Sequence, residues 1–166
     1  MCGIIGFTGR KPAKDILIDG LERLEYRGYD SAGIALLNDD DTLTIRKKAG
    51  RVSELRELCK DGDYSSTCGI GHTRWATHGG VTDANAHPHR CGNVALIHNG
   101  IIENYSDIIR EYGLADKLVS ETDSEVVAAL LDTLYDGDPI AAIRKAVKII
   151  AVSYTHLRAH ETTLHL

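Results

Sequence analysis

The sequence predicts an α+β fold, in which antiparallel strands and helices form separate layers. Strand patterns gather before residue 100, and long helical patterns follow it, whereas a doubly wound parallel sheet would alternate the two. The chain of 166 residues is long enough for one hydrophobic core, and no internal repeat or low-complexity linker divides it. We therefore expect one α+β domain.

The first elements follow from the spacing of apolar residues. Residues 2–8 are apolar with two glycine interruptions nearby, which predicts a short buried strand. Residues 13–26 place apolar side chains at helical spacing with charges opposite. Strand patterns at 34–37 and 42–47 flank an acidic turn at 38–41, and this arrangement predicts a hairpin.

The middle of the chain combines a short helix, two strands and a long loop. Apolar spacing predicts the helix at 52–59 and a second pair of strands at 68–72 and 93–98. A loop of about twenty residues in a compact domain is more often functional than idle. This loop holds the only tryptophan, Trp75, and the second strand ends in the turn dipeptide Asn99-Gly100.

Helical patterns occupy the last part of the chain. Two helices are expected near 104–112 and 124–135. A third should begin with Asp138 as its N-cap and Pro139 at its first helical position, where proline is favoured.

Composition excludes several classes of function. The net charge of −5 without a basic cluster gives no reason to expect nucleic acid or an acidic membrane surface as a partner. No apolar run reaches transmembrane length, and Arg10 and Lys11 interrupt any signal-peptide pattern. We expect a cytoplasmic protein.

The four cysteines show no paired spacing, so disulfides are not expected in a reducing compartment. Cys68 with His72, and His87 with His89 and Cys91, supply the ligand types of a zinc site. They lack the tight Cys-x2-Cys pairing of structural zinc sites. We expect neither a metal nor a cofactor.

Cys2 is a candidate nucleophile because it directly follows the initiator methionine. If Met1 is removed, Cys2 carries a thiol and a free α-amine, whose reference pKa is about 7.7–8.0. Nucleophile and general base would then belong to one residue, as in N-terminal-threonine enzymes. The alternative is an incidental cysteine at a frayed chain end.

Five further positions could complete an amide-cleaving site. Asn99 and Gly100 could donate a side-chain and a backbone N–H to an oxyanion, or form a plain tight turn. Arg74 could hold a carboxylate with its planar fork. Trp75 could cover the site or anchor its loop. Asp123 could cap a helix or bind an ammonium group; a carboxylate clamp with an ammonium clamp describes a free amino acid.

Several strings together resemble one family. They are Met1-Cys2-Gly3-Ile4, Glu25-Tyr26-Arg27-Gly28-Tyr29-Asp30-Ser31-Ala32-Gly33, His72-Thr73-Arg74-Trp75-Ala76-Thr77-His78-Gly79, Asn85-Ala86-His87-Pro88-His89, His98-Asn99-Gly100-Ile101-Ile102-Glu103-Asn104 and Ser120-Glu121-Thr122-Asp123. In this order they closely resemble the glutaminase domain of the glucosamine-6-phosphate synthases, also called glutamine–fructose-6-phosphate aminotransferases (isomerizing). The resemblance covers about residues 1–150.

The resemblance implies an N-terminal-nucleophile hydrolase fold, in which two stacked antiparallel sheets lie between helical layers. It implies that Cys2 attacks the side-chain amide of glutamine and that its α-amine acts as the base. Asn99 and Gly100 would form the oxyanion hole, and Arg74 and Asp123 would bind the α-carboxylate and α-ammonium groups.

The resemblance assigns the remaining positions and partners as well. Trp75, Thr77 and His78 would belong to the loop that closes over glutamine, while His72, His87, His89 and His98 would be structural. Glutamine would be the partner of this domain, in a homo-oligomer without metal or cofactor. Fructose 6-phosphate would be used only through a second, isomerase region. The phosphoribosyl-pyrophosphate amidotransferases and asparagine synthetases share the Met-Cys-Gly start and are the alternative families.

The chain departs from this family near its C-terminus. We expect a partial, C-terminally truncated glutamine amidotransferase domain over residues 1–152 and a foreign or aberrant tail over residues 153–166. Without later strands a sheet edge would be uncovered, so we expect marginal stability and aggregation. The alternative to an active glutaminase half is therefore an inactive fragment that binds glutamine at best.

Overall fold

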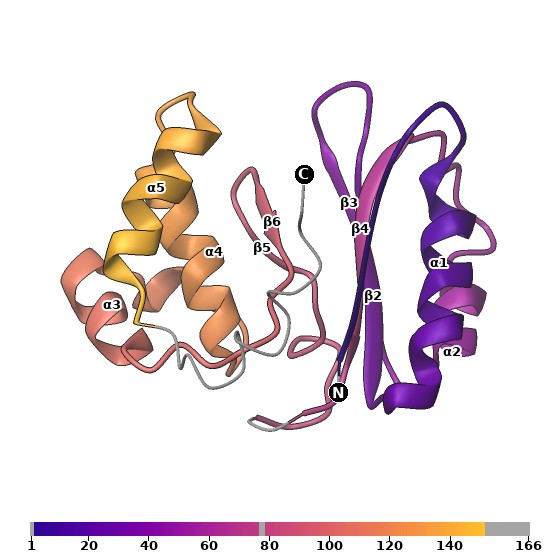
Figure 1. Ribbon diagram of the computed structural model, residues 1–166, viewed down its shortest axis with the longest axis horizontal. Coiled ribbons are helices and arrows are strands. Elements are labelled where there is room, and N and C mark those ends of the chain that lie inside the picture. Colours follow the sequence, from indigo (N-terminus) through magenta and orange to yellow (C-terminus); the bar gives the residue numbers. More distant parts are fainter. Residues whose placement is uncertain (1, 77–78, 152–166) are drawn as a thin grey trace, which may run out of the picture.

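The computed structural model describes residues 2–76 and 79–151. Its elements form four successive layers (Figure 1). Helices α1 and α2 cover one face of a four-stranded sheet, a two-stranded hairpin faces the other side of that sheet, and helices α3 to α5 lie beyond the hairpin. This arrangement confirms the expected α+β class with two antiparallel sheets between helical layers.

The four-stranded sheet is formed by the N-terminal half of the chain. Its strands are β1 (Gly3–Thr8), β2 (Ser31–Leu37), β3 (Leu43–Ala49) and β4 (Cys68–Arg74), in the order β1-β4-β2-β3. All neighbours are antiparallel, and Gly3 pairs with Thr73 while Ser31 pairs with Arg74. The register therefore brings the start of β1, the start of β2 and the end of β4 to the same end of the sheet.

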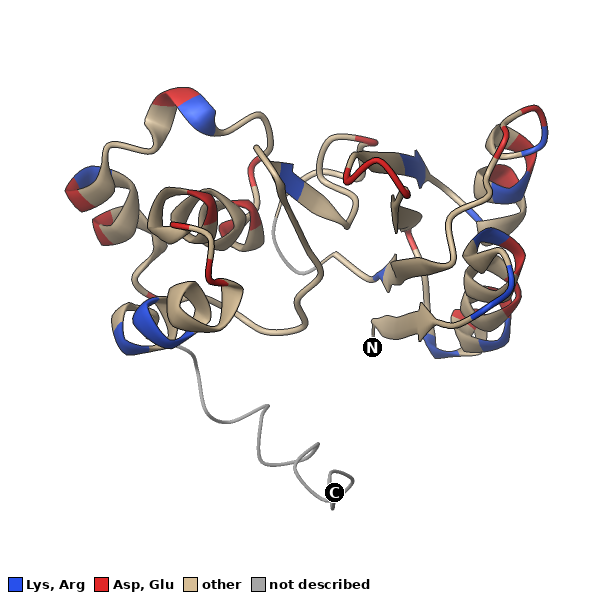
Figure 2. Ribbon diagram, turned by 90° about the horizontal axis from the view of Figure 1, so that it is seen from above, with Lys and Arg blue, Asp and Glu red and all other residues tan. Residues whose placement is uncertain are grey.

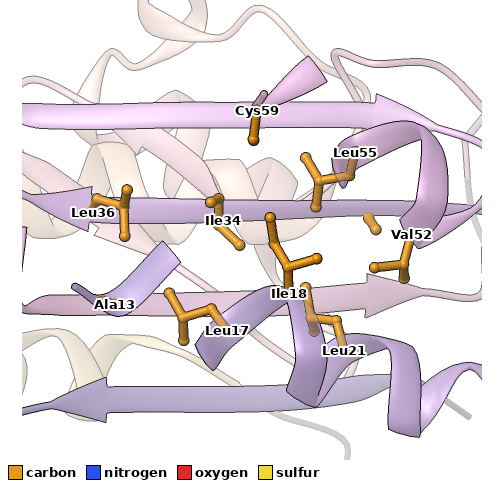
Figure 3. Close-up of a cluster of buried hydrophobic side chains, with 10 residues drawn as sticks. Ala13, Leu17, Ile18, Leu21, Ile34, Leu36, Val52, Leu55 and Cys59 are labelled. Carbon is orange, nitrogen blue, oxygen red and sulfur yellow. The ribbon is translucent and has the colours of Figure 1, made fainter. Parts of the chain in front are cut away.

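A hydrophobic core joins this sheet to α1 (Ala13–Leu24) and α2 (Val52–Leu58). The chain leaves α1 through a 3-10 turn at Glu25–Arg27. Leu17, Ile18 and Leu21 of α1 pack against Ile34 and Leu36, which point from alternate positions of β2 to the helical side (Figure 3). The apolar residues of α1 recur at helical spacing and those of β2 at every second position, and both sets pack into one cluster.

The second half of the chain builds its own cluster around the hairpin. Strands β5 (His89–Cys91) and β6 (Val94–Leu96) pair antiparallel, and α4 (Asp123–Leu134) packs on both. Helices α3 (Tyr105–Tyr112) and α5 (Pro139–Ile149) contact α4, and a 3-10 turn at Ala115–Lys117 connects α3 to the segment before α4.

The N-terminus of α5 has the expected cap. The Asp138 carboxylate accepts hydrogen bonds from the Ile140 and Ala141 N–H groups at 2.9 and 3.1 Å, and Pro139 is the first helical residue. Both parts of that prediction are confirmed.

An apolar cavity of about 890 Å³ separates the two halves. It is lined on one side by residues of β2 and β4, including Leu37 and Ile70, and on the other by residues of the hairpin, α4 and α5, including Leu96 and Val147. Leu37 and Val147 remain 42% and 67% exposed. The cavity is therefore open to solvent on the side of Leu37 and Val147, although Arg90 of β5 reaches across to the Leu43 carbonyl oxygen of β3 at 3.4 Å.

Three predictions about the strands were wrong. Strands β4 and β6 are not partners, because β4 pairs with β1 and β2 whereas β6 pairs with β5. The long loop also contains β5, whose sequence His89-Arg90-Cys91 has no strand-like alternation of apolar residues. The first strand was expected to be buried, but β1 is an edge strand with alternate exposed residues.

The described residues show no segregation of charge on the helices and no disulfide bond. Basic and acidic residues are interspersed along the helices rather than gathered on one face (Figure 2). All four cysteines are free thiols. No described helix is long and apolar enough to cross a membrane.

Candidate active site

Cys2 lies at the end of the sheet where the two halves of the chain meet. It precedes β1, is half-buried, and its Sγ accepts a hydrogen bond from the Trp75 N–H at 3.1 Å. Gly3 adds a second hydrogen bond between the same two segments, since its N–H donates to Thr73 Oγ1 at 3.0 Å. The pairing of β1 with β4 thus fixes the thiol beside the loop that begins after Arg74.

Asn99 brings the second half of the chain to Cys2. It lies in the turn after β6, and its Nδ2 donates to the Cys2 carbonyl oxygen at 3.3 Å. Its Oδ1 lies 2.8 Å from His72 Nε2. Gly100 follows on the same exposed turn. An amide N–H donor is therefore held beside the candidate nucleophile, as an oxyanion hole requires.

Arg74 is buried, with only 5% of its surface exposed, although the sequence allowed a solvated surface arginine. Its Nη1 donates to the Gly80 carbonyl oxygen at 3.0 Å. Gly80 in turn donates its N–H to Glu121 Oε2 at 3.2 Å. The guanidinium is therefore anchored across the base of the loop that follows β4.

A pair of side chains fixes the far end of that loop. Asn85 Nδ2 donates to Glu121 Oε2 at 3.0 Å, and the Glu121 N–H donates back to Asn85 Oδ1 at 3.0 Å. The Asn85 and Gly80 hydrogen bonds lower the pKa of the Glu121 carboxyl. This reciprocal pair links the loop to the segment before α4.

Asp30 fixes the near end of the same loop. Its Oδ2 accepts a hydrogen bond from the Ala76 N–H, and its own N–H donates to the Arg74 carbonyl oxygen at 2.7 Å. Trp75, between these two, is 54% exposed and its ring lies over Gly28. A Cβ at residue 28 would come within 2.4 Å of that ring, and the φ of +105° also favours glycine there.

Asp123 is the first residue of α4 rather than its N-cap, which is Thr122. The simple capping role is therefore wrong. Its Oδ2 accepts the Ile102 N–H at 2.7 Å, so the carboxylate is held against the segment that follows Asn99 and Gly100. Thr77 and His78 lie outside the described residues.

Three buried histidines lie behind Asn99. His72 and His87 stack with ring centroids 4.3 Å apart, and His87 meets His89 edge-on at 4.4 Å. Burial lowers the pKa of His72 to about 4 and that of His89 to about 3, and it lowers the pKa of His87 further. All three imidazoles are therefore neutral at pH 7.

Among the described residues, no group of three or more His, Cys, Asp and Glu side chains is arranged to hold a metal ion. The cysteine and histidine spacing considered for zinc therefore has no corresponding cluster within them. His89 Nε2 is instead 2.9 Å from Thr122 Oγ1, and the Cys91 Sγ donates to Asp132 Oδ2 at 3.7 Å.

The structure adds Asp30, Asn85 and Glu121 to the residues that the sequence had suggested for the site. Their hydrogen bonds go to backbone groups and to each other across 36 to 46 positions of the chain. The only sequence signal for them is their place inside the unusual strings around residues 30, 85 and 121. Together the arrangement presents a thiol, an amide donor, a guanidinium and a carboxylate at one end of the sheet.

A family model described as class II glutamine amidotransferases matches residues 20–161. Curated relatives named glutamine–fructose-6-phosphate aminotransferase [isomerizing] are similar over most of the chain. The protein from Caldanaerobacter subterraneus is 52% identical over 93% of this chain and 26% of its own length. Those from Thermus thermophilus and Fusobacterium nucleatum are 49% and 50% identical over 97% of this chain and 27% of their own length.

The fold of this chain is similar to that of two solved structures. The glutamine phosphoribosylpyrophosphate amidotransferase of B. subtilis superimposes with a TM-score of 0.74 at 25% identity, covering 92% of this chain and 33% of that one. A structure described as the allosteric regulatory enzyme of purine biosynthesis gives a TM-score of 0.76 at 26% identity over 92% of this chain and 34% of that one. These likenesses confirm the expected N-terminal-nucleophile hydrolase fold.

The chain spans about a quarter of the length of the curated relatives it matches. The matched range and the level of identity nevertheless cover nearly all of it. The chain therefore belongs to the class II glutamine amidotransferases.

Proposed function

We propose that this chain is the glutamine-hydrolysing part of a glutamine–fructose-6-phosphate aminotransferase. The observation that carries the proposal is the contact of Cys2 with both halves of the fold. Trp75 donates its N–H to the thiol at 3.1 Å, and Asn99 donates to the Cys2 carbonyl oxygen at 3.3 Å. These contacts support a site in which the candidate nucleophile lies beside both the loop that follows β4 and the candidate oxyanion donor.

The reaction follows from these positions once Met1 is removed. The Cys2 α-amine, acting through water, takes the thiol proton, and the thiolate attacks the side-chain amide carbon of glutamine. Asn99 and the Gly100 N–H stabilise the negative charge that develops on the amide oxygen. The protonated nitrogen leaves as ammonia, and water then hydrolyses the thioester to glutamate and regenerates the thiol.

Two charged groups recognise glutamine as an amino acid. Arg74 binds the α-carboxylate, since a guanidinium offers a planar pair of donors to it. Asp123 binds the α-ammonium group. Trp75 covers the bound glutamine and keeps the thioester from bulk water until ammonia has left. The proposal gives the same role to Thr77 and His78, which lie outside the described residues.

In the proposed enzyme, a second region outside this chain, the isomerase region, would transfer the ammonia to fructose 6-phosphate. The assignment to this enzyme is supported by the roughly 50% identity with relatives named glutamine–fructose-6-phosphate aminotransferase, compared with 25% to 26% for the two solved structures. The same proposal includes the cytoplasm as the location and a homo-oligomer as the assembly, with neither nucleic acid nor membrane as a partner. It also includes a domain boundary at residue 152, before a foreign tail at 153–166.

The test is an intact-mass measurement after treatment with a diazoketone analogue of glutamine, with Cys2→Ala as the control. We expect one adduct on a chain that lacks Met1 and no adduct on the variant. Release of glutamate and ammonia from glutamine, lost in Cys2→Ala, completes the test. A soluble chain that lacks Met1 and neither forms the adduct nor hydrolyses glutamine would contradict the proposal.

A further inference from the structure

The Asn99 side chain is held between two groups of opposite hydrogen-bonding character. Its Nδ2 faces an acceptor, the Cys2 carbonyl oxygen, at 3.3 Å. Its Oδ1 faces His72 Nε2 at 2.8 Å. An asparagine amide is nearly symmetric in shape, so only such neighbours decide which end presents the donor.

These two contacts are satisfied together by one arrangement of protons. A carbonyl oxygen can only accept, which requires the amide nitrogen of Asn99 at the Cys2 side. The amide oxygen then faces His72, and Nε2 of that ring must carry the proton. The reverse arrangement would place two oxygens against each other at the Cys2 side.

His72 is a rigid donor because its surroundings fix the ring. It lies in β4, is 1% exposed, and stacks on His87 with an interplanar angle of 28°. Burial and the neighbouring Arg74 lower its pKa, so the ring is neutral at pH 7 and carries a single proton. Asn99, by contrast, is exposed and lies in a turn without regular structure.

We propose that His72 is a positioning residue that holds the Asn99 amide nitrogen toward Cys2, and thereby assembles the oxyanion hole. This role rests on the proposed glutamine hydrolysis and revises the expectation that His72 is only structural. Without a donor on the Oδ1 side, the exposed amide is free to rotate and to turn its oxygen toward the developing oxyanion. His72 therefore acts on the rate of the chemical step rather than on glutamine binding.

The position of the ring proton can be measured without turnover. Long-range proton–nitrogen NMR spectra of the full chain, with specifically labelled histidine, report which nitrogen of His72 is protonated. We expect a neutral ring with the proton on Nε2, assigned by its loss in His72→Gln. Asn99→Ala should shift the Nε2 resonance. A proton on Nδ1, or no response to Asn99→Ala, would overturn the proposal.

Two amide substitutions provide a matched kinetic test. The glutamine side chain places an N–H donor at the position of Nε2, whereas the asparagine side chain is too short to reach it. We expect His72→Asn to lower kcat for glutamine hydrolysis about tenfold or more, below the full effect of losing one oxyanion donor, with KM nearly unchanged. His72→Gln should restore most of kcat. Equal kcat values for the two variants would contradict the role.

Two controls separate positioning from general destabilisation. Ser66→Ala removes a buried hydroxyl that donates to the Cys68 carbonyl oxygen at 2.9 Å, at the opposite end of β4. It should lower thermal stability but leave kcat unchanged. In an Asn99→Ala background, His72→Asn should cost no further kcat, because the group that it positions is absent.

The proposed function and this inference fail in different ways. A chain that does not hydrolyse glutamine contradicts the function, while the NMR measurement still decides whether His72 donates to Asn99. A chain that hydrolyses glutamine but loses the same kcat in His72→Asn and His72→Gln supports the function and refutes the positioning role.

Discussion

The carbonyl oxygen of His87 lies directly against the Cα of Gly33 in β2. A Cβ at residue 33 would come within 2.2 Å of that oxygen and within 2.9 Å of the Arg46 carbonyl oxygen. The loop that carries the histidine stack therefore rests on the backbone of the sheet, and glycine permits this close approach.

Gly33→Ala should destabilise the protein because backbone, rather than a flexible side chain, fills the space. We expect a loss of about 1–3 kcal/mol in the free energy of unfolding, as for overpacked cores. Gly6→Ala is the matched control, since it lies in β1 of the same sheet with nothing within 4 Å of a new Cβ. Urea unfolding of both variants checks this, and equal stabilities would contradict it.

Asp123→Asn should weaken glutamine binding more than it slows chemistry. The Asp123 carboxylate accepts the Ile102 N–H at 2.7 Å. An asparagine amide oxygen can still accept this hydrogen bond, but the negative charge is lost. We expect KM for glutamine to rise about tenfold or more, the value of one charge-assisted hydrogen bond. Glutaric acid monoamide lacks the α-ammonium group, so its KM should be the same for both proteins. A similar rise with that substrate would argue against an ammonium contact.

Glu121→Ala should loosen the loop between β4 and β5 without unfolding the domain. Glu121 Oε2 accepts hydrogen bonds from Gly80 and Asn85 at 3.2 and 3.0 Å, and the side chain lies at the surface. We expect KM for glutamine to rise several-fold while the melting temperature changes little. Steady-state kinetics and thermal unfolding check this together. A large fall in melting temperature at constant KM would assign Glu121 to stability instead.

Stability should fall as the pH is lowered below about 6.5, the ordinary pKa of histidine. The folded protein holds the pKa of His72 at about 4 and that of His89 at about 3, so the unfolded state binds protons first. Stability is thus fully present above the unfolded pKa and is lost as the pH falls toward the folded values. Each histidine contributes a slope of up to about 1.4 kcal/mol per pH unit.

Urea unfolding between about pH 5 and pH 8 measures this slope. His87→Phe should remove the contribution of one proton, because the lowered pKa of His87 comes chiefly from burial. A slope that is identical in the variant would show that His87 is protonated, or accessible to protons, in the folded state.

Much of the fold could be predicted where a pattern is local. The spacing of Leu17, Leu21 and Leu24 predicts α1, and the acidic turn before β3 predicts the hairpin. The Asp138 cap is equally local, since its partners are two and three residues away. These elements depend on contacts within one helix or one turn, which short-range patterns specify.

The failures involve contacts between distant segments. β5 consists of three residues without alternation; it pairs with the adjacent β6, and both strands pack on α4, which comes much later in the chain. Capping of α4 was one of two roles considered for Asp123, but the cap is Thr122, and the Asp123 carboxylate accepts the Ile102 N–H, 21 positions away. Sequence strings identified His72 and Asn99 together, but not that one faces the other across 27 positions.

Residue identity alone specifies the chemical groups of the site and the family to which they point. The order of the strings from Met1-Cys2 to Asp123 depends only on residue identity. How these groups act on one another depends on the folded chain, as the burial of Arg74 and the contact between His72 and Asn99 illustrate. The reason is physical: burial, pKa and hydrogen-bond direction depend on what surrounds a side chain, and here those surroundings come from strands and turns that are distant in the chain.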